Sequence, residues 1–226
     1  MTYIQPNQQE GITRKEWLEL RKKGISGTGA SAVMGYNPYL TNVEYWELLT
    51  GRKQAEDISH KPCVQYGLAA EAPLIELFKL DFPKYQVTHK DYDLRVHQEK
   101  PFLLGSIDGE LLEIATGRKG ILEIKTTNIL QSMQKEKWRD GLPMNYFYQV
   151  LHYLLVTGFE FVELKAQLKR VYKQDDGKDD VRLDTRHYSF ERDEVNELLV
   201  ELEAKETEFW ERYIIPDIRP PLLLRL

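Results

Sequence analysis

Two acidic residues and one lysine, Asp108, Glu123 and Lys125, have the types and the spacing needed for metal-assisted chemistry. They belong to the stretch 102–125, in which two apolar-rich segments flank a polar turn at 115–120, a pattern typical of a β-hairpin. Side chains alternate between the two faces of a strand, so Glu123 and Lys125 should share one face. Asp108 lies in or beside the preceding strand, and the hairpin would bring all three side chains together.

Carboxylate oxygens are the ligands that Mg²⁺ prefers, and one or two of them usually hold the ion together with phosphate oxygens of a substrate. A metal held in this way lowers the pKa of bound water and neutralises the charge that develops on a phosphodiester. Lys125 beside it would orient the attacking hydroxide or stabilise the pentavalent phosphorus. The alternative is a solvated hairpin with a Lys–Glu pair on one face, which is a common arrangement.

Length and composition indicate one substantial folded domain. The 226 residues are 42% hydrophobic and 30% charged, which is too apolar for a disordered chain. The single cysteine, Cys63, excludes an internal disulfide, a four-cysteine zinc site and a cysteine-ligated iron–sulfur cluster. No apolar run has the length of a membrane span and the N-terminus has no signal-peptide layout, so we expect a cytoplasmic protein without a membrane partner.

The net charge of −5 counts against a protein whose whole surface binds nucleic acid. It does not exclude a local basic channel, because binding responds to the field at the groove. One basic helix is predicted from Thr13, its N-cap, to about Lys23, with Glu16 at the capping-box position. The simplest interpretation of this helix is a solvated face.

The segment 24–35 alternates glycine with hydroxyl residues before an Ala/Val/Met run, which predicts a tight loop that opens into a helix. Backbone N–H groups and hydroxyls at such a place favour an anion, and Arg21 is near enough in sequence to join Ser26, Thr28 and Ser31. The alternative is a flexible glycine loop. The segment is not a Walker motif, because no Gly-Lys-Ser/Thr follows.

A further carboxylate, Glu71, falls on a helical stripe that otherwise consists of Leu68, Ile75 and Phe78. An unpaired buried carboxylate is costly, so a carboxylate on such a face usually meets a cation or a metal. The alternative is that Pro73 kinks or starts the helix and turns Glu71 outward.

The remaining pattern predicts further helices and strands around the hairpin. We expect them, in chain order, as helices at 42–50 and 64–80, one or two strands within 85–96, a basic helix after Asn128, a helix at 145–157, strands at 159–172 and 181–190, and a long helix at 193–213. The helix 145–157 places Gln149 on an aromatic stripe, which is usually core. The apolar tail 216–226 is typical of an oligomer or partner contact. We see no repeat or linker and predict one domain, 1–226, with the C-terminal helix and tail at 191–226.

Together these motifs resemble those of phage lambda exonuclease and the YqaJ-type viral recombinases, within the PD-(D/E)XK nuclease superfamily. The likeness spans roughly 17–158. It rests on five motifs in one order: Arg21 before a Gly-Ile-Ser-Gly loop, Gly67 four residues before Glu71, Gly-Ser-Ile-Asp108-Gly, Glu123-Ile-Lys125, and Gln149-Val-Leu-His-Tyr153 ending at Thr157-Gly158.

The resemblance implies an α/β (α+β) fold with a restriction-endonuclease-like core, a mixed β-sheet flanked by helices. Asp108 and Glu123 would be metal ligands, with the backbone carbonyl of Ile124 completing the first site. Glu71 would serve a second metal, so that the site holds two Mg²⁺ ions, with Mn²⁺ as a substitute. Lys125 would activate water, and Gln149 would support the site from the neighbouring helix.

The resemblance also implies that Arg21 and the hydroxyl loop hold a 5′-phosphate. Its activity would be 5′→3′ exonuclease digestion of linear double-stranded DNA, which leaves 3′ overhangs. The partners would be a single-strand annealing protein of the RecT or Red beta type and further copies in a toroidal homotrimer, within a bacterial host cell. Two departures are visible: family loops often read Gly-Gly-Ser-Asp where this chain has 26–29 as Ser-Gly-Thr-Gly, and Leu151 replaces a frequent glutamine.

Two alternatives remain open. One is a nuclease of the same superfamily with another polarity or with endonucleolytic action. The other is a non-catalytic module that binds DNA ends and has kept the fold. The complete set of Asp108, Glu123, Lys125 and Glu71 argues against the second, because a binding module does not need all four.

Overall fold

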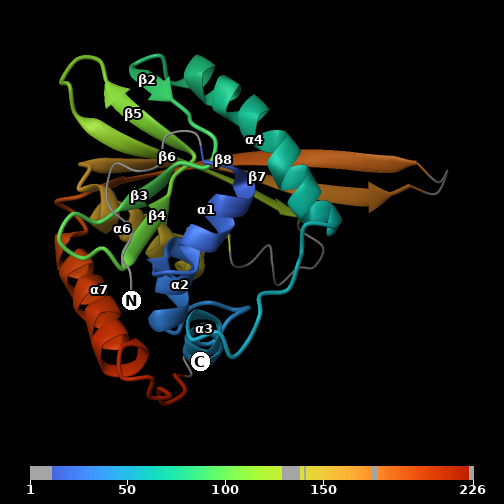
Figure 1. Cartoon of the computed structure of the whole chain (residues 1–226). Helices are drawn as coiled ribbons and strands as arrows, with labels where there is room; N and C mark the ends of the chain where they lie inside the picture. Colours follow the sequence, from blue (N-terminus) through green and yellow to red (C-terminus); the bar gives the residue numbers. More distant parts are fainter. Residues whose placement is uncertain (1–11, 129–137, 140, 175–177, 224–226) are drawn as a thin grey trace.

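A computed structural model describes residues 12–128, 138–139, 141–174 and 178–223. Five strands form the main sheet in the order β2-β5-β6-β7-β8, and three short strands form a second sheet in the order β1-β4-β3 (Figure 1). The strands are β1 (Ile25–Ser26), β2 (Tyr85–Thr88), β3 (Leu94–Val96), β4 (Leu103–Ser106), β5 (Gly109–Glu113), β6 (Lys119–Asn128), β7 (Phe161–Lys173) and β8 (Asp179–Glu191). The helices are α1 (Arg14–Arg21), α2 (Gly27–Val33), α3 (Asn42–Leu49), α4 (Pro62–Asp81), α6 (Met144–Thr157), α7 (Asn196–Phe209) and the π-helical turn η1 (Trp210–Ile214).

Strand β6 is the centre of the main sheet. It pairs antiparallel with β5 and parallel with β7, so the sheet is mixed. Alternation along β6 sends Leu122 and Ile124 into the core cluster that contains Ile75 and Phe78 of α4. Ile121 points the other way, into the cluster beneath α6. The main sheet is therefore a layer between α4 on one face and α6 on the other, which confirms the predicted fold class.

Local sequence explains where several helices begin and end. Thr13 and Thr41 each form a complete capping box, with Glu16 and Glu44 respectively. Pro62 occupies the first turn of α4, where the missing N–H costs nothing. Helix α6 ends at Gly158, whose φ of 70° lies in the left-handed region that glycine reaches freely.

The predicted hairpin is correct for β5 and β6, but the segment before Asp108 differs from the prediction. That segment divides into β4 and β5, which belong to different sheets. β4 pairs in parallel with the two residues of β1 and antiparallel with β3. Asp108 lies in the short link between β4 and β5, and thus at the junction of the two sheets.

The predicted apolar stripe of helix α4 is wrong at one position, Leu68. Leu68 is 61% exposed, because the buried contacts of α4 with the sheet begin only near Ala70. Ile75 and Phe78 are buried as predicted. The helix continues through Pro73, whose missing N–H leaves the carbonyl of Ala69 on an exposed turn where water can bind it.

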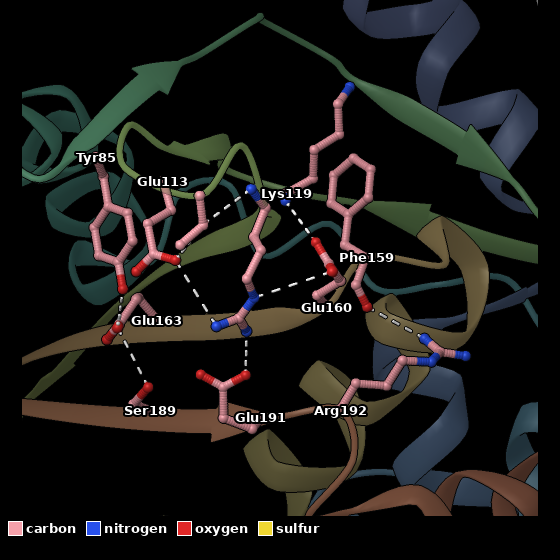
Figure 2. Close-up of polar contacts among 11 residues, drawn as sticks. Tyr85, Glu113, Lys119, Phe159, Glu160, Glu163, Ser189, Glu191 and Arg192 are labelled. Atoms are coloured by element: carbon pink, nitrogen blue, oxygen red, sulfur yellow. Dashed lines mark hydrogen bonds and ion pairs between the residues drawn. The ribbon is translucent and has the colours of Figure 1, made fainter.

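A cluster of polar side chains lies on the main sheet near the start of β6 (Figure 2). Tyr85 of β2 donates to Glu163 of β7 at 2.8 Å, and Ser189 of β8 donates to the same carboxylate at 3.2 Å. Arg118, just before β6, forms ion pairs with Glu191 and other acids. These bonds link both edge strands to β7 and to the turn before β6, so the frame around β6 is held by polar contacts as well as by its core.

The C-terminal segments also follow the prediction closely. The strands β7 and β8 form one long antiparallel hairpin, which extends past the other strands (Figure 1). Beyond α7 and η1 the chain returns to α3, where Asn42 bonds the backbone of Pro221 at 2.8 Å and of Leu223 at 3.0 Å. Most of the basic helix predicted after Asn128 lies outside the described residues, and β6 itself continues through Asn128. Among the described helices, no stretch is long and apolar enough to span a membrane.

Candidate active site

Glu123, Lys125 and Gln149 meet on the α6 face of the main sheet. The Lys125 ammonium forms an ion pair with Glu123 Oε1. The side chain of Gln149, on α6, donates to the same oxygen at 3.2 Å and to the hydroxyl of Tyr153 at 2.8 Å. Glu123 is only 1% exposed, so these contacts fix a carboxylate that is almost fully out of water.

Asp108 joins this group from the junction of the two sheets. Its Oδ2 accepts a hydrogen bond from the backbone N–H of Ile124 at 2.8 Å. This bond places the Asp108 carboxylate against the backbone of β6, next in sequence to Glu123 and Lys125. The ring Nδ1 of His89, in the loop after β2, lies 2.6 Å from the backbone carbonyl of Asp108. This contact restrains the backbone of the link between β4 and β5.

The electrostatics of the site fit four interacting ionisable groups. Burial and the nearby Asp108 raise the pKa of Glu123 to about 8, although Lys125 acts in the opposite direction. Burial also raises the pKa of Asp108. Burial would lower the pKa of Lys125, but the carboxylates of Glu123 and Asp108 outweigh it and raise that pKa. Burial and Asp108 raise the pKa of Glu71, which shows that α4 brings this half-buried carboxylate within electrostatic range of the others.

This arrangement fits a bound cation. Glu123 Oε2 is buried and has no hydrogen-bond partner among the described atoms. An unpaired buried carboxylate oxygen costs free energy that a metal would recover. Within the part of the chain that the structure describes, no three acidic, histidine or cysteine side chains already form a ligand cluster. Asp108 and Glu123, with the carbonyl of Ile124 and with Glu71, are thus still the expected donors and do not form a ready-made cluster of three side chains.

The hydroxyl segment forms the loop-to-helix turn that the sequence predicts. Ser26 caps α2, and its hydroxyl accepts from the N–H of Gly29 at 3.4 Å. Thr28 is exposed. Ser31 is different: it is 1% exposed, donates to the carbonyl of Thr28 at 2.9 Å and accepts from the side chain of Asn37 at 3.0 Å. Because its hydroxyl is buried and occupied, Ser31 is poorly placed for an anion, and Ser26 and Thr28 remain the candidates.

Arg21 reaches the same region from the end of α1. Its guanidinium lies over the ring of Trp17, 4.3 Å from the centroid. The indole N–H of Trp17 donates to the hydroxyl of Ser106 at 3.0 Å, two residues before Asp108. This chain of contacts ties the predicted phosphate ligand to the strand that leads into the site.

Sequence reasoning gave no role to Tyr45, Trp17, Ser106 or Tyr153, all of which hold site residues in place. The Tyr45 hydroxyl accepts from the N–H of Ser26 at 3.0 Å. Tyr153 had a signal, since it lies four residues after Gln149 on one helix face. Trp17 had the same signal, since it lies four residues before Arg21 on α1. Tyr45 and Ser106 act across distances in sequence that leave no local pattern.

Solved structures share this fold. The alkaline exonuclease LHK-Exo from Laribacter hongkongensis superposes with a TM-score of 0.62 at 19% identity, over 88% of this chain and 91% of that one. The structure of LHK-Exo in complex with dAMP gives 0.61, again at 19% identity and over the same shares. At this identity the likeness defines the class of fold, that of an exonuclease-type α/β protein.

The family follows from a closer match. Residues 16–160 match the model of the YqaJ-like viral recombinase domain, and the chain belongs to this family. It is also 31% identical over 217 residues to the uncharacterized protein YqaJ of Bacillus subtilis (strain 168), over 93% of this chain. The match covers 60% of that relative's length.

Proposed function

We propose that this protein is a nuclease that hydrolyses DNA phosphodiester bonds, and more specifically a Mg²⁺-dependent 5′→3′ exonuclease on linear duplexes. The observation that supports it most is the group of Asp108, Glu123 and Lys125, with an unpaired buried oxygen on Glu123. A bound Mg²⁺ would give this oxygen the partner that it lacks among the described atoms.

Each side chain has a role in this proposal. Asp108, Glu123 and the carbonyl of Ile124 hold the first of two ions, and Glu71 serves the second. Bound Mg²⁺ supplies a more acidic water and neutralises charge on the phosphate. Lys125 orients the attacking water and stabilises the pentavalent phosphorus. Gln149 keeps Glu123 in position through its bond to Oε1.

In this proposal the polarity of digestion and the preference for phosphorylated ends depend on Arg21 and the hydroxyl segment at the start of α2. Arg21 with Ser26 and Thr28 holds the terminal 5′-phosphate, so that the scissile bond reaches the carboxylates. Helix α1 and the turn after it also carry exposed cations, Arg14, Lys15 and Lys23, in a chain whose net charge is negative. They suit the phosphates of a duplex that approaches this side.

The proposal extends to partners and assembly. A 5′→3′ exonuclease leaves a 3′ single strand, and we propose that a single-strand annealing protein receives it. The family resemblance motivates a toroidal homotrimer around the duplex and a cytoplasmic location in a bacterial cell. Size-exclusion chromatography at a series of protein concentrations, combined with light scattering, would measure the number of copies in the assembly.

One experiment tests the activity and its polarity together. A linear duplex labelled at either its 5′ or its 3′ end, with and without a 5′-phosphate, is incubated with Mg²⁺, Mn²⁺ or EDTA. We expect early release of the 5′ label, faster with the phosphate and absent in EDTA. Early 3′ release would reverse the polarity, and cleavage of covalently closed circles would favour an endonuclease. Tight binding without release in either metal would favour the end-binding module.

Alanine variants test the individual roles. Asp108→Ala, Glu123→Ala and Lys125→Ala should each abolish cleavage while circular dichroism shows an intact fold. Full activity in any purified variant would contradict the role of that residue.

A further inference from the structure

A histidine and a glutamate form a fully buried pair that the proposed chemistry does not use. His152 on α6 and Glu206 on α7 are both 0% exposed. The ring Nδ1 of His152 lies 2.7 Å from Glu206 Oε1, and Nε2 lies 3.0 Å from the backbone carbonyl of Leu104. Both ring nitrogens are therefore engaged.

The partners define the protonation of the ring. A carbonyl oxygen only accepts hydrogen bonds, so Nε2 carries a hydrogen toward Leu104. Toward an ionised Glu206 carboxylate, Nδ1 would donate as well and the ring would be an imidazolium; toward a protonated carboxyl, Nδ1 would accept and the ring would be neutral. Burial would lower the pKa of His152, but the Glu206 carboxylate and these hydrogen bonds outweigh it and raise the pKa.

The position of this pair relates it to the candidate active site. His152 lies three residues after Gln149 on the same helix, and Leu104 lies on β4, four residues before Asp108. The ring thus connects the helix that holds Glu123 with the strand that leads to Asp108.

On its C-terminal side Asp108 is held by the β5–β6 ladder, which pairs Gly109 with Leu122, and by its own bond to the N–H of Ile124. On its N-terminal side it follows β4, which belongs to the other sheet and forms no ladder with β6. A tie from α6 to β4 supplies a constraint on that side.

We propose that His152 and Glu206 are positioning residues, which together hold α6, α7 and β4 so that Asp108 and Glu123 stay at the distance a shared metal requires. The kinetic part of this inference rests on the proposed nuclease function. It also makes α7 part of the working site, although the family match ends at residue 160.

Four variants separate positioning from simple stability. His152→Leu removes both bonds, and Glu206→Leu removes only the bond to α7. Glu206→Gln keeps a side chain that can bond either protonation state of the ring. Glu208→Leu is the control, since it removes an acid from the same helix that faces water and pairs with Lys205.

We expect kcat for a 5′-phosphorylated duplex to fall between about tenfold and 100-fold in His152→Leu, because displaced catalytic groups cost rates of this order. The KM should change by less than about threefold, since the residue touches no substrate. The kcat of Glu206→Leu should lie between those of the wild type and His152→Leu. The kcat values of Glu206→Gln and Glu208→Leu should match that of the wild type. Folded leucine variants with wild-type kcat would overturn the proposal.

Nuclear magnetic resonance supplies a test that needs no cleavage. In the wild type, ¹⁵N shifts should show His152 protonated at both ring nitrogens at neutral pH. The amide resonance of Ile124, which reports its bond to Asp108, should move in Glu206→Leu and stay in Glu208→Leu. An Ile124 amide that does not move in Glu206→Leu would refute the tie. A wild type that binds DNA without cutting it would refute the proposed function alone, because both resonances would still report the positioning.

Discussion

Removing the guanidinium of Arg21 should selectively remove the preference for phosphorylated ends. Arg21 is half-buried against Trp17, which already restricts its position, so a phosphate contact would lose little side-chain entropy. A hydrogen bond to a charged group contributes about 1.5–3 kcal/mol. At about 1.4 kcal/mol for each factor of ten, Arg21→Ala should lower kcat/KM for a 5′-phosphorylated end by roughly 10- to 150-fold. A 5′-hydroxyl end offers no such contact and should lose little.

The assay compares the two ends directly. The ratio of kcat/KM for phosphorylated and hydroxyl duplexes is measured in the wild type, in Arg21→Ala and in Arg14→Ala. Arg14 is the matched control, because it removes one positive charge from the same helix without a contact to Trp17. Arg21→Lys should give an intermediate ratio, since an ammonium keeps the charge but loses the planar fork. An unchanged ratio in Arg21→Ala, or an equal loss on both ends, would refute the assignment of this pocket.

Two further predictions concern stability around α2 and α3. In Gly29→Ala the new Cβ would overlap the ring of Tyr45, so we expect a loss of about 1–3 kcal/mol, visible as a lower melting temperature. The same substitution should cost less when it is made in a Tyr45→Ala chain and compared with Tyr45→Ala alone, because the ring is then absent. Glu44 has its pKa lowered to about 2 by Lys53 and by the cap at Thr41. A lowered carboxyl pKa stabilises the fold above the unfolded value and loses this effect as the pH falls through the folded one. Urea titrations should therefore show the wild type losing stability between about pH 4.5 and 2, more than Glu44→Gln does; parallel curves would contradict it.

Local patterns carried most of the secondary structure. The alternation along β6, the capping boxes of α1 and α3, and the Gly158 stop of α6 are all short-range signals, and the structure has each of them. The stripe of α4 failed at Leu68, because burial there depends on where the helix leaves the sheet. The local sequence pattern does not indicate where α4 leaves the sheet.

The candidate site was predictable in its residue types and less so in its geometry. Glu123 and Lys125 are two residues apart on one strand, so their shared face follows from the period of the strand. Asp108 reaches β6 through the predicted hairpin, since Gly109 pairs with Leu122, but its place at the junction of two sheets depends on the pairing of β4 with β1 and β3, which has no local signal. Ser31 was a candidate by type alone, and only packing shows that its hydroxyl is occupied.

The placement of Asp108 between two sheets has a consequence for partial unfolding. The smaller sheet has strands of two to four residues, whereas the main sheet contains the 13-residue strands β7 and β8. Short ladders open at lower free energy than long ones, and proteins open in such cooperative units before they unfold completely. An opening of the smaller sheet would free the N-terminal side of Asp108, while β5 and the bond to the Ile124 N–H would still hold its other side. The protein would thus reach a mostly folded state in which Asp108 is less constrained than Glu123 and Lys125. Amide exchange in β4 should then be faster than in β7 at denaturant concentrations where the main sheet is still intact.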